Sequence, residues 1–236
     1  MCGRYVAAAP PSEIAKYFAA APTETILEPS FNVAPTNEVY AVVERDDERR
    51  LDHLRWGLVP LWAKDVAIGS KMINARAEGI ATKNAYRHAF RKQRCIIPAD
   101  GFFEWKVVEG QKRKQPMYIH RVDGEPLAFA GLWETWRGPE RNDDPLRTCT
   151  IITTTANETM APVHNRMPVI LPPDKWPQWL DPEMQDTDVL AEFLVPAPSS
   201  LLTLYPITTA VNHVRNKGPE LIVPLSDALE PGQLPL

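Results

Sequence analysis

The sequence predicts a single α+β domain whose core is a β-rich curved sheet or barrel, with helices at its periphery. Short runs of β-branched and aromatic residues recur along the chain, and helical patterns are fewer. The 24 prolines are scattered from Pro10 to Pro235 and amount to about twice the usual share of roughly 5%. Scattered prolines end many short elements, whereas prolines gathered in one place would indicate a linker between two domains.

Seven segments have the composition and length of strands. They are VYAVVE from Val39, RCIIPADGFFEWKV from Arg94, PMYIHRV from Pro116, LAFAGLWETW from Leu127, CTIITTTA from Cys149, PVILP from Pro168 and LLTLYPIT from Leu201. Because these segments are apolar and spread over most of the chain, we expect them to form the core.

Three segments have helical patterns. They are SEIAKYFAAA from Ser12, with Ser12 as its N-cap, the stretch 78–93, and TDVLAEFLV from Thr187. Residues 1–225 are expected to form the domain. Residues 226–236 are expected to form a loose tail, because EPGQLPL offers little to bury.

The overall composition is that of a globular protein with a buried core: 44% of residues are hydrophobic, 24% are charged and the net charge is −4. That charge gives no global signature of a nucleic-acid binder. No segment resembles a secretion signal or approaches the roughly 18 to 20 apolar residues that span a bilayer. We therefore expect a cytoplasmic protein without a membrane partner, associated with the nucleoid if it is bacterial.

A local basic segment lies within this acidic chain. Between Lys71 and Arg94, seven Lys and Arg residues accompany one acid, Glu78, which gives a local charge of +6. Such a segment is either a solvated helix face or a surface that contacts phosphates. The segments FNVAPT at 31–36 and RWGLVPLWAKD at 55–65 are rich in aromatics and prolines. They are either core and turn residues or a platform on which unpaired bases stack.

The three cysteines are odd in number, widely spaced and free of any CxxC pair, which argues against a disulfide framework and a structural zinc site. Cys95 and Cys149 lie in apolar runs and are expected in the core. Cys2 differs, because a small residue after Met1 permits removal of that methionine. Cys2 would then carry a free α-amine beside its thiol, and a 1,2-aminothiol reacts characteristically with aldehydes.

Three polar residues interrupt apolar stretches: Asn74 in INAR, Glu104 in PADGFFEW and His164 in VHNRMP. Each alone has an ordinary explanation, as a satisfied buried amide, a solvated carboxylate or a non-catalytic histidine. Together with an N-terminal nucleophile they indicate an active site.

The segments MCGR, WGLVPLWAKD, INARAEG, RCIIPADGFFEW and HNRMPVIL resemble, in this order, the motifs of the SOS response-associated peptidase (SRAP) family. The resemblance extends from Cys2 to at least Val223. It implies an α+β domain with a β-rich core that recognises abasic sites in single-stranded DNA. Members of this family bond covalently to the lesion through their N-terminal cysteine and shield it from strand cleavage.

The resemblance also implies residue roles. Cys2 would be the nucleophile, and Asn74, Glu104 and His164 the active-site polar set. The DNA-binding residues would be Arg4, Asn32, Pro35, Trp62, Arg76 and Arg166, with the three arginines on the DNA backbone.

The expected chemistry starts from the open aldehyde of the abasic sugar. The α-amine attacks it to give a Schiff base, and the Cys2 thiol closes a five-membered thiazolidine. Glu104 is expected to shuttle protons, His164 to assist sugar ring opening and Asn74 to hold the α-amine or a sugar hydroxyl. No cofactor or metal is expected, because the five histidines lack metal-binding spacing.

Two alternatives remain open from the sequence. The first is a cysteine-dependent peptidase in which Cys2, His164 and Glu104 act as nucleophile, base and orienting group, with autocatalytic removal of Met1. The second is a non-catalytic single-strand binding module, in which only the basic and aromatic surface matters. A lyase activity is a further possibility, and we expect a monomer.

Overall fold

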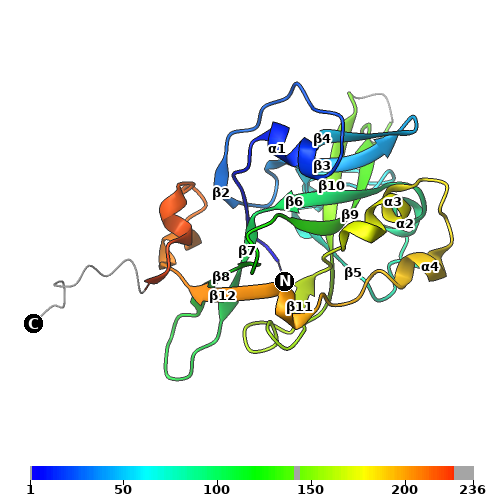
Figure 1. Ribbon diagram of the computed structural model, residues 1–236. Helices are drawn as coiled ribbons and strands as arrows, with labels where there is room; N and C mark the ends of the chain where they lie inside the picture. The colour runs from blue at the N-terminus through cyan, green and yellow to red at the C-terminus, as the bar shows by residue number, and fades with distance from the viewer. Residues whose placement is uncertain (1, 141–143, 226–236) are drawn as a thin grey trace, which may run out of the picture.

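The computed structural model describes residues 2–140 and 144–225, so the expected tail at 226–236 lies outside the described residues. The described chain forms one domain of two β-sheets with short helices around them (Figure 1). This confirms the α+β prediction and its curved, β-rich core. None of the helices in the described part of the chain is long and apolar enough to cross a membrane.

The first sheet has five strands in the order β12-β8-β7-β1-β2. All of its pairings are antiparallel. The strands are β1 (Tyr5–Ala7), β2 (Ser30–Val33), β7 (Gly101–Lys106), β8 (Gln115–Arg121) and β12 (Leu202–Pro206). Strand β1, only a few residues from the chain start, therefore lies inside a sheet with a partner on each side.

The second sheet closes on itself. Its path is β11-β10-β4-β3-β6-β9, and β9 pairs again with β10, while β5 pairs with β10 in parallel. Closure leaves β10, β4, β3, β6 and β9 without an open edge between them. The strands are β3 (Glu38–Arg45), β4 (Glu48–Trp56), β5 (Asn74–Arg76), β6 (Arg94–Ala99), β9 (Leu127–Trp136), β10 (Leu146–Thr155) and β11 (Arg166–Pro168).

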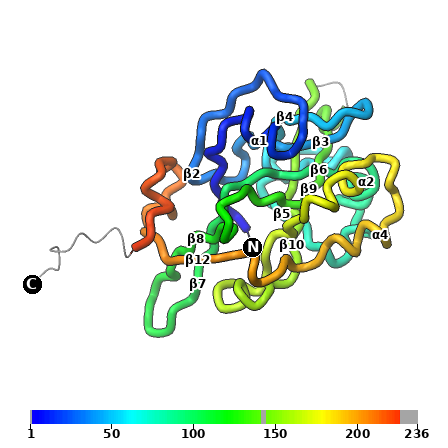
Figure 2. The backbone as a smooth tube through the Cα atoms, viewed as in Figure 1, coloured from blue at the N-terminus to red at the C-terminus, as the bar shows by residue number. Residues whose placement is uncertain are grey.

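Alternation along the strands divides the apolar residues between separate cores. In β3, Val39, Ala41 and Val43 enter the main core together with residues of the first sheet, while Tyr40 and Val42 enter a second core beneath the helices. A third, smaller core lies between the first sheet and the segment 207–222. Figure 2 shows that segment on the side of the molecule away from α2 and α4.

The helices are short and peripheral. They are α1 (Pro11–Tyr17), α2 (Arg87–Lys92), α3 (Trp176–Leu180) and α4 (Thr187–Ala191), and 3₁₀ turns occupy Val66–Lys71, Pro173–Lys175, Ser199–Leu201, Thr209–Asn212 and Pro219–Ile222. The expected N-cap at Ser12 is wrong: Pro10 is the cap, and Ser12 lies in the first turn. Asp186 caps α4 through its side chain.

The run 94–107 gives two strands rather than one. β6 belongs to the second sheet and β7 to the first, and the chain crosses between them at Asp100. The Asp100 carboxylate accepts hydrogen bonds from Ala8 N at 2.7 Å and Ala9 N at 3.3 Å. The crossing therefore brings the end of the first strand against the start of β7. Cys95 and Cys149 are free and buried, as predicted.

Asn32 holds the segment 207–222 against the first sheet. It is fully buried, and its amide nitrogen donates to the carbonyls of Val211, His213 and Asn216 at 3.1–3.2 Å. Its amide oxygen accepts from Arg4 Nη1 at 3.0 Å. One side chain thus satisfies four buried or half-buried polar groups.

The variant Asn32→Ala should lower the free energy of unfolding by about 2–4 kcal/mol. The Asn216 carbonyl loses its donor, the Val211 and His213 carbonyls each lose one of two donors, and the Arg4 guanidinium loses one of two acceptors. Urea denaturation followed by circular dichroism measures this. The matched control Asn84→Ala removes an amide from an exposed position and should change stability by no more than about 0.5 kcal/mol. Equal effects of the two variants would contradict the role given to Asn32.

Candidate active site

Cys2 lies in the interior of the protein, directly before β1. It is fully buried and belongs to the main core. Its carbonyl oxygen accepts a hydrogen bond from Asn74 Nδ2 at 2.8 Å, and its thiol lies 3.9 Å from the Arg4 carbonyl oxygen. Residue 2 is therefore held in one position.

Asn74 connects Cys2 to the second sheet. It begins β5 and pairs with Ile151 of β10. Its amide nitrogen is used by Cys2, whereas its amide oxygen is buried and has no hydrogen-bond partner in the described structure. A buried acceptor without a donor is costly unless a ligand or another state of the protein supplies one.

Glu104 comes from the neighbouring strand β7 and is 3% exposed. Burial raises the pKa of the Cys2 thiol, and the negative charge of Glu104 raises it further. The pairing of β7 with β1, in which Phe103 N donates to the Arg4 carbonyl at 3.0 Å, places Glu104 beside the residues that precede β1. The structure thus places Cys2, Asn74 and Glu104, which come from three separate sequence motifs, near one another, and their catalytic roles stay predictions.

His164 lies in a neighbouring basic cavity of about 500 Å³, which is lined by Arg76, Thr155, His164, Asn165 and Arg166. The His164 Nδ1 atom accepts a hydrogen bond from the Arg166 backbone nitrogen at 3.0 Å. An accepting Nδ1 places the proton of the neutral ring on Nε2. The ring is therefore arranged as a donor through Nε2.

Arg166 is already engaged by a carboxylate. Its Nη1 and Nη2 atoms donate to the two oxygens of Glu78 at 2.6 and 2.9 Å, and Nη2 also donates to the Thr153 carbonyl at 2.6 Å. These hydrogen bonds lower the pKa of Glu78. A phosphate would have to compete with Glu78 for the same two-pronged site. Glu78 was not singled out from the sequence as a site residue, although it stands in the INARAEG motif.

The remaining expected DNA contacts are more dispersed. Arg4 donates to Asn32 and to the Val211 carbonyl, and its half-burial lowers its pKa. Asn32 has no exposed surface, and Pro35, three residues further along the chain, is half-buried. In this structure Arg4 and Asn32 therefore stabilise the fold, and their contact with DNA stays a prediction.

Trp62 lies in a fixed, exposed loop. The loop begins at Gly57, which has a φ of +127°. A Cβ at this position would lie 2.6 Å from the Gly69 carbonyl oxygen, so there is no room for a side chain. Trp136 Nε1 holds the Ala63 carbonyl at 2.8 Å. Trp62 is 51% exposed, whereas Trp56 is fully buried and packs edge-on against Tyr5. Only the first of these two tryptophans is placed to stack on a base, and that contact also stays a prediction.

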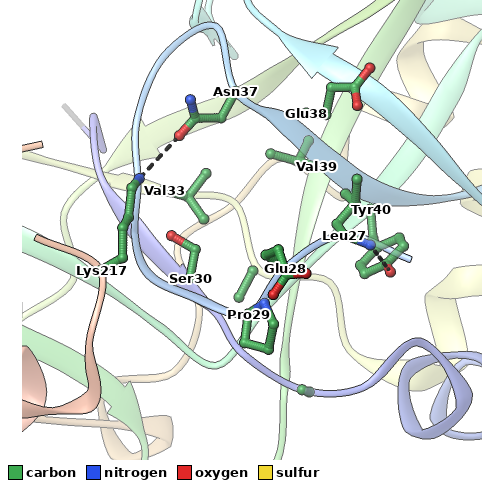
Figure 3. Close-up of a pocket in the computed structure, with 12 residues that line it drawn as sticks. Leu27, Glu28, Pro29, Ser30, Val33, Asn37, Glu38, Val39, Tyr40 and Lys217 are labelled. Carbon is green, nitrogen blue, oxygen red and sulfur yellow. Dashed lines mark hydrogen bonds between the residues drawn. The ribbon is translucent and has the colours of Figure 1, made fainter. Parts of the chain in front are cut away.

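A different cavity, of about 310 Å³, lies between β2 and β3 (Figure 3). The amine of Lys217 points toward Asn37 there and donates to its Oδ1 at 3.3 Å. Of the residues expected in the active site, none lines this cavity. Among the described residues, no three His, Cys, Asp or Glu side chains gather as a metal site.

Comparisons with known proteins agree with the motifs. A model of the SOS response associated peptidase (SRAP) family matches residues 1–214. The abasic site processing protein YoqW of Bacillus subtilis is 47% identical over 194 residues, which cover 82% of this chain and 85% of that protein. The abasic site processing protein YedK of Escherichia coli is 35% identical over 198 residues, 83% of this chain and 84% of that one.

Solved structures share the fold. A Bacteroides thetaiotaomicron protein superposes with a TM-score of 0.82 at 24% identity, covering 94% of this chain and 99% of its own. A Bordetella bronchiseptica protein gives a TM-score of 0.74 at 30% identity, covering 88% of this chain and 100% of its own. The chain belongs to the SOS response associated peptidase family.

Proposed function

We propose that this protein captures abasic sites in single-stranded DNA by forming a covalent bond to Cys2 once Met1 has been removed. The names of its relatives support abasic-site processing. The observation that carries the covalent step is the contact between Asn74 and Cys2: one amide atom holds the Cys2 carbonyl at 2.8 Å, and the other is a buried acceptor without a donor.

The free α-amine of Cys2 supplies the missing donor. While Met1 is attached, the Cys2 nitrogen belongs to a peptide bond and is not nucleophilic. After its removal, the amine can donate to the Asn74 amide oxygen, which orients its lone pair. The nearby Glu104 carboxylate is placed to accept the proton that an ammonium group loses before attack.

The reaction then balances without a cofactor. The amine adds to the aldehyde carbon, and water leaves to form the Schiff base. The thiol adds to the imine carbon, its proton passes to the nitrogen, and a thiazolidine results. One water is released in total, and nothing is oxidised or reduced.

The cavity beside this centre suits the flanking DNA. Arg76 and Arg166 supply positive charge for phosphates, and His164 Nε2 supplies a donor for the sugar ring oxygen as the ring opens. A peptidase acting through Cys2 is less well supported, because burial and Glu104 raise the pKa of the thiol, whereas a cysteine nucleophile needs its thiolate.

Incubation of the purified, Met1-free protein with a single-stranded oligonucleotide carrying one abasic site should give a band that resists denaturing electrophoresis. A tetrahydrofuran site, which has no aldehyde, and the Cys2→Ala protein should give none. Intact mass should equal protein plus DNA minus one water. Absence of the band with protein whose Met1 is shown by mass to be removed would refute covalent capture. Cleavage of added peptides by that protein would favour the peptidase alternative.

The variant Asn74→Asp should slow crosslinking by about tenfold, because the hydrogen bond to the Cys2 carbonyl is lost and about 1.4 kcal/mol corresponds to a factor of ten. The rate is measured at saturating DNA, so that weaker binding does not contribute. Thermal unfolding checks that the variant is folded. A wild-type rate in a folded Asn74→Asp protein would exclude Asn74 as the residue that positions Cys2.

The variant Glu78→Gln should raise the affinity for single-stranded DNA without a lesion by about two- to fivefold, because Arg166 then loses a competing carboxylate worth at most about 1 kcal/mol at the surface. Fluorescence anisotropy at constant salt measures this. The Arg166→Gln variant should weaken binding and should remove the effect of the Glu78 change. A lower affinity of Glu78→Gln would instead show that Glu78 positions Arg166.

A further inference from the structure

Helix α2 presents a cluster of cations that the proposed reaction does not use. A cavity of about 630 Å³ is lined by Thr82, Arg87, His88, Arg91, Lys92 and Gln185, together with one alanine. The lining residues include no carboxylate. Three permanent positive charges therefore face the same open space.

The position of Arg87 is unfavourable for the helix itself. Arg87 and Arg91 are four residues apart and so lie on the same face, where like charges repel. Arg87 also stands in the first turn, where the helix dipole disfavours a cation. Among the described residues, neither these arginines nor Lys92 form a side-chain hydrogen bond or ion pair. Arg91 and Lys92 stand in the last turn, where the dipole favours cations, but none of the three side chains makes an individual polar contact within the described structure.

The remaining groups around the cavity leave its charge positive. His88 Nδ1 lies 3.1 Å from Glu134 of β9, a carboxyl that is 3% exposed and whose pKa is raised by burial. Arg94, at the end of the same basic segment, is buried and donates to four backbone carbonyls. One arginine of the segment is therefore structural, while Arg87, Arg91 and Lys92 are exposed.

The cluster is close to the candidate active site. Tyr86, which caps α2, donates its hydroxyl to the Asn74 carbonyl at 3.4 Å. Thr82, in the α2 cavity, is six positions after Arg76, in the His164 cavity, so the chain between them spans at most about 20 Å. A single strand, whose nucleotides are spaced more widely than the 3.4 Å of a duplex strand, covers that distance in no more than about six nucleotides.

We propose that Arg87, Arg91 and Lys92, here called the α2 cluster, form a second phosphate-contacting site. It binds the backbone of the lesion-bearing strand several nucleotides from the abasic site. The proposal rests on the proposed function for the identity of that strand. A backbone ligand explains why the cluster collects charge without acids and without the geometry that reads a base.

The test compares wild type with the triple variant Arg87→Gln, Arg91→Gln, Lys92→Gln. The first measurement is the ratio of crosslinking rates, at subsaturating protein, for a long (about 25-nucleotide) and a short (about 7-nucleotide) abasic oligonucleotide. The second is the salt dependence of binding to an intact 25-mer. Wild type should prefer the long strand, and in the variant this ratio should fall toward one. The slope of log affinity against log salt should become shallower by about 2, or 0.7 for each lost phosphate contact.

The matched control removes three charges elsewhere, with Lys112→Gln, Arg113→Gln, Lys114→Gln in the exposed turn between β7 and β8. It should retain the wild-type ratio. Equal losses in both triple variants would overturn the proposal, because the effect would then be one of total charge. An unchanged ratio and slope in the α2 variant would also overturn it.

Failure of the proposed function would be seen separately. If neither oligonucleotide crosslinks to wild type, covalent capture is wrong, but the salt slope on intact DNA still tests the α2 cluster. The thermal unfolding temperature of the α2 variant should change little, since loss of the like-charge pair offsets loss of two cations from the last turn of the helix.

Discussion

The hydrogen bond from Asn74 to the carbonyl of Cys2 fixes the part of the chain on which the candidate chemistry depends. Chain termini usually fray. Here β1 lies between β2 and β7, and the register continues toward the terminus, because Phe103 N donates to the Arg4 carbonyl at 3.0 Å. The strand pairing fixes the chain up to Arg4, and the Asn74 hydrogen bond fixes residue 2. The two sheets therefore hold the Cys2 thiol, the Asn74 amide and the Glu104 carboxylate near one another, and in the proposed reaction such positioning is a large part of the advantage of an intramolecular step.

The cations of this acidic protein fall into two groups that sequence composition cannot separate. Arg4 and Arg94 point inward and donate mainly to backbone carbonyls. They thus supply donors to carbonyls that lie around the short elements. Arg76 and the α2 cluster remain at the surface. Arg166 is intermediate, since its guanidinium is largely covered but held by an exposed carboxylate. A local charge of +6 in the sequence thus overstates the charge available to a ligand, because Arg94 is buried.

The sequence predicted strands correctly where the residues are apolar throughout, and it missed structure that depends on pairing between residues distant in the sequence. LAFAGLWETW coincides with β9, because both of its faces are buried. β4 was missed, because it is rich in charged residues that are balanced only in three dimensions: Asp52, for example, pairs with Arg147 of β10. The stretch 78–93 was expected to be helical throughout, yet only Arg87–Lys92 is α-helix, since turns at Gly79 and Lys83 lead into it. For the site, Cys2, Asn74 and Glu104 could be named from the motifs in which they stand. The pairing of Glu78 with Arg166 could not be predicted, because it joins positions 88 residues apart and leaves no local signal in the sequence.

The burial of Cys2 has a consequence for the order of steps in the proposed reaction. Its thiol is kept protonated by burial and by the charge of Glu104, so the sulfur is a poor first nucleophile. An α-amine has an ordinary pKa of about 7.7–8.0 and is partly neutral near pH 7, so it can attack the aldehyde first. The resulting imine carbon is then tethered within reach of the sulfur, and ring closure is intramolecular, which compensates for a scarce thiolate. The same carboxylate that disfavours the thiolate is suited to take a proton from the ammonium group. A buried, acid-flanked cysteine is therefore a weak choice for a free thiol nucleophile, and a reasonable one for an aminothiol whose amine reacts first.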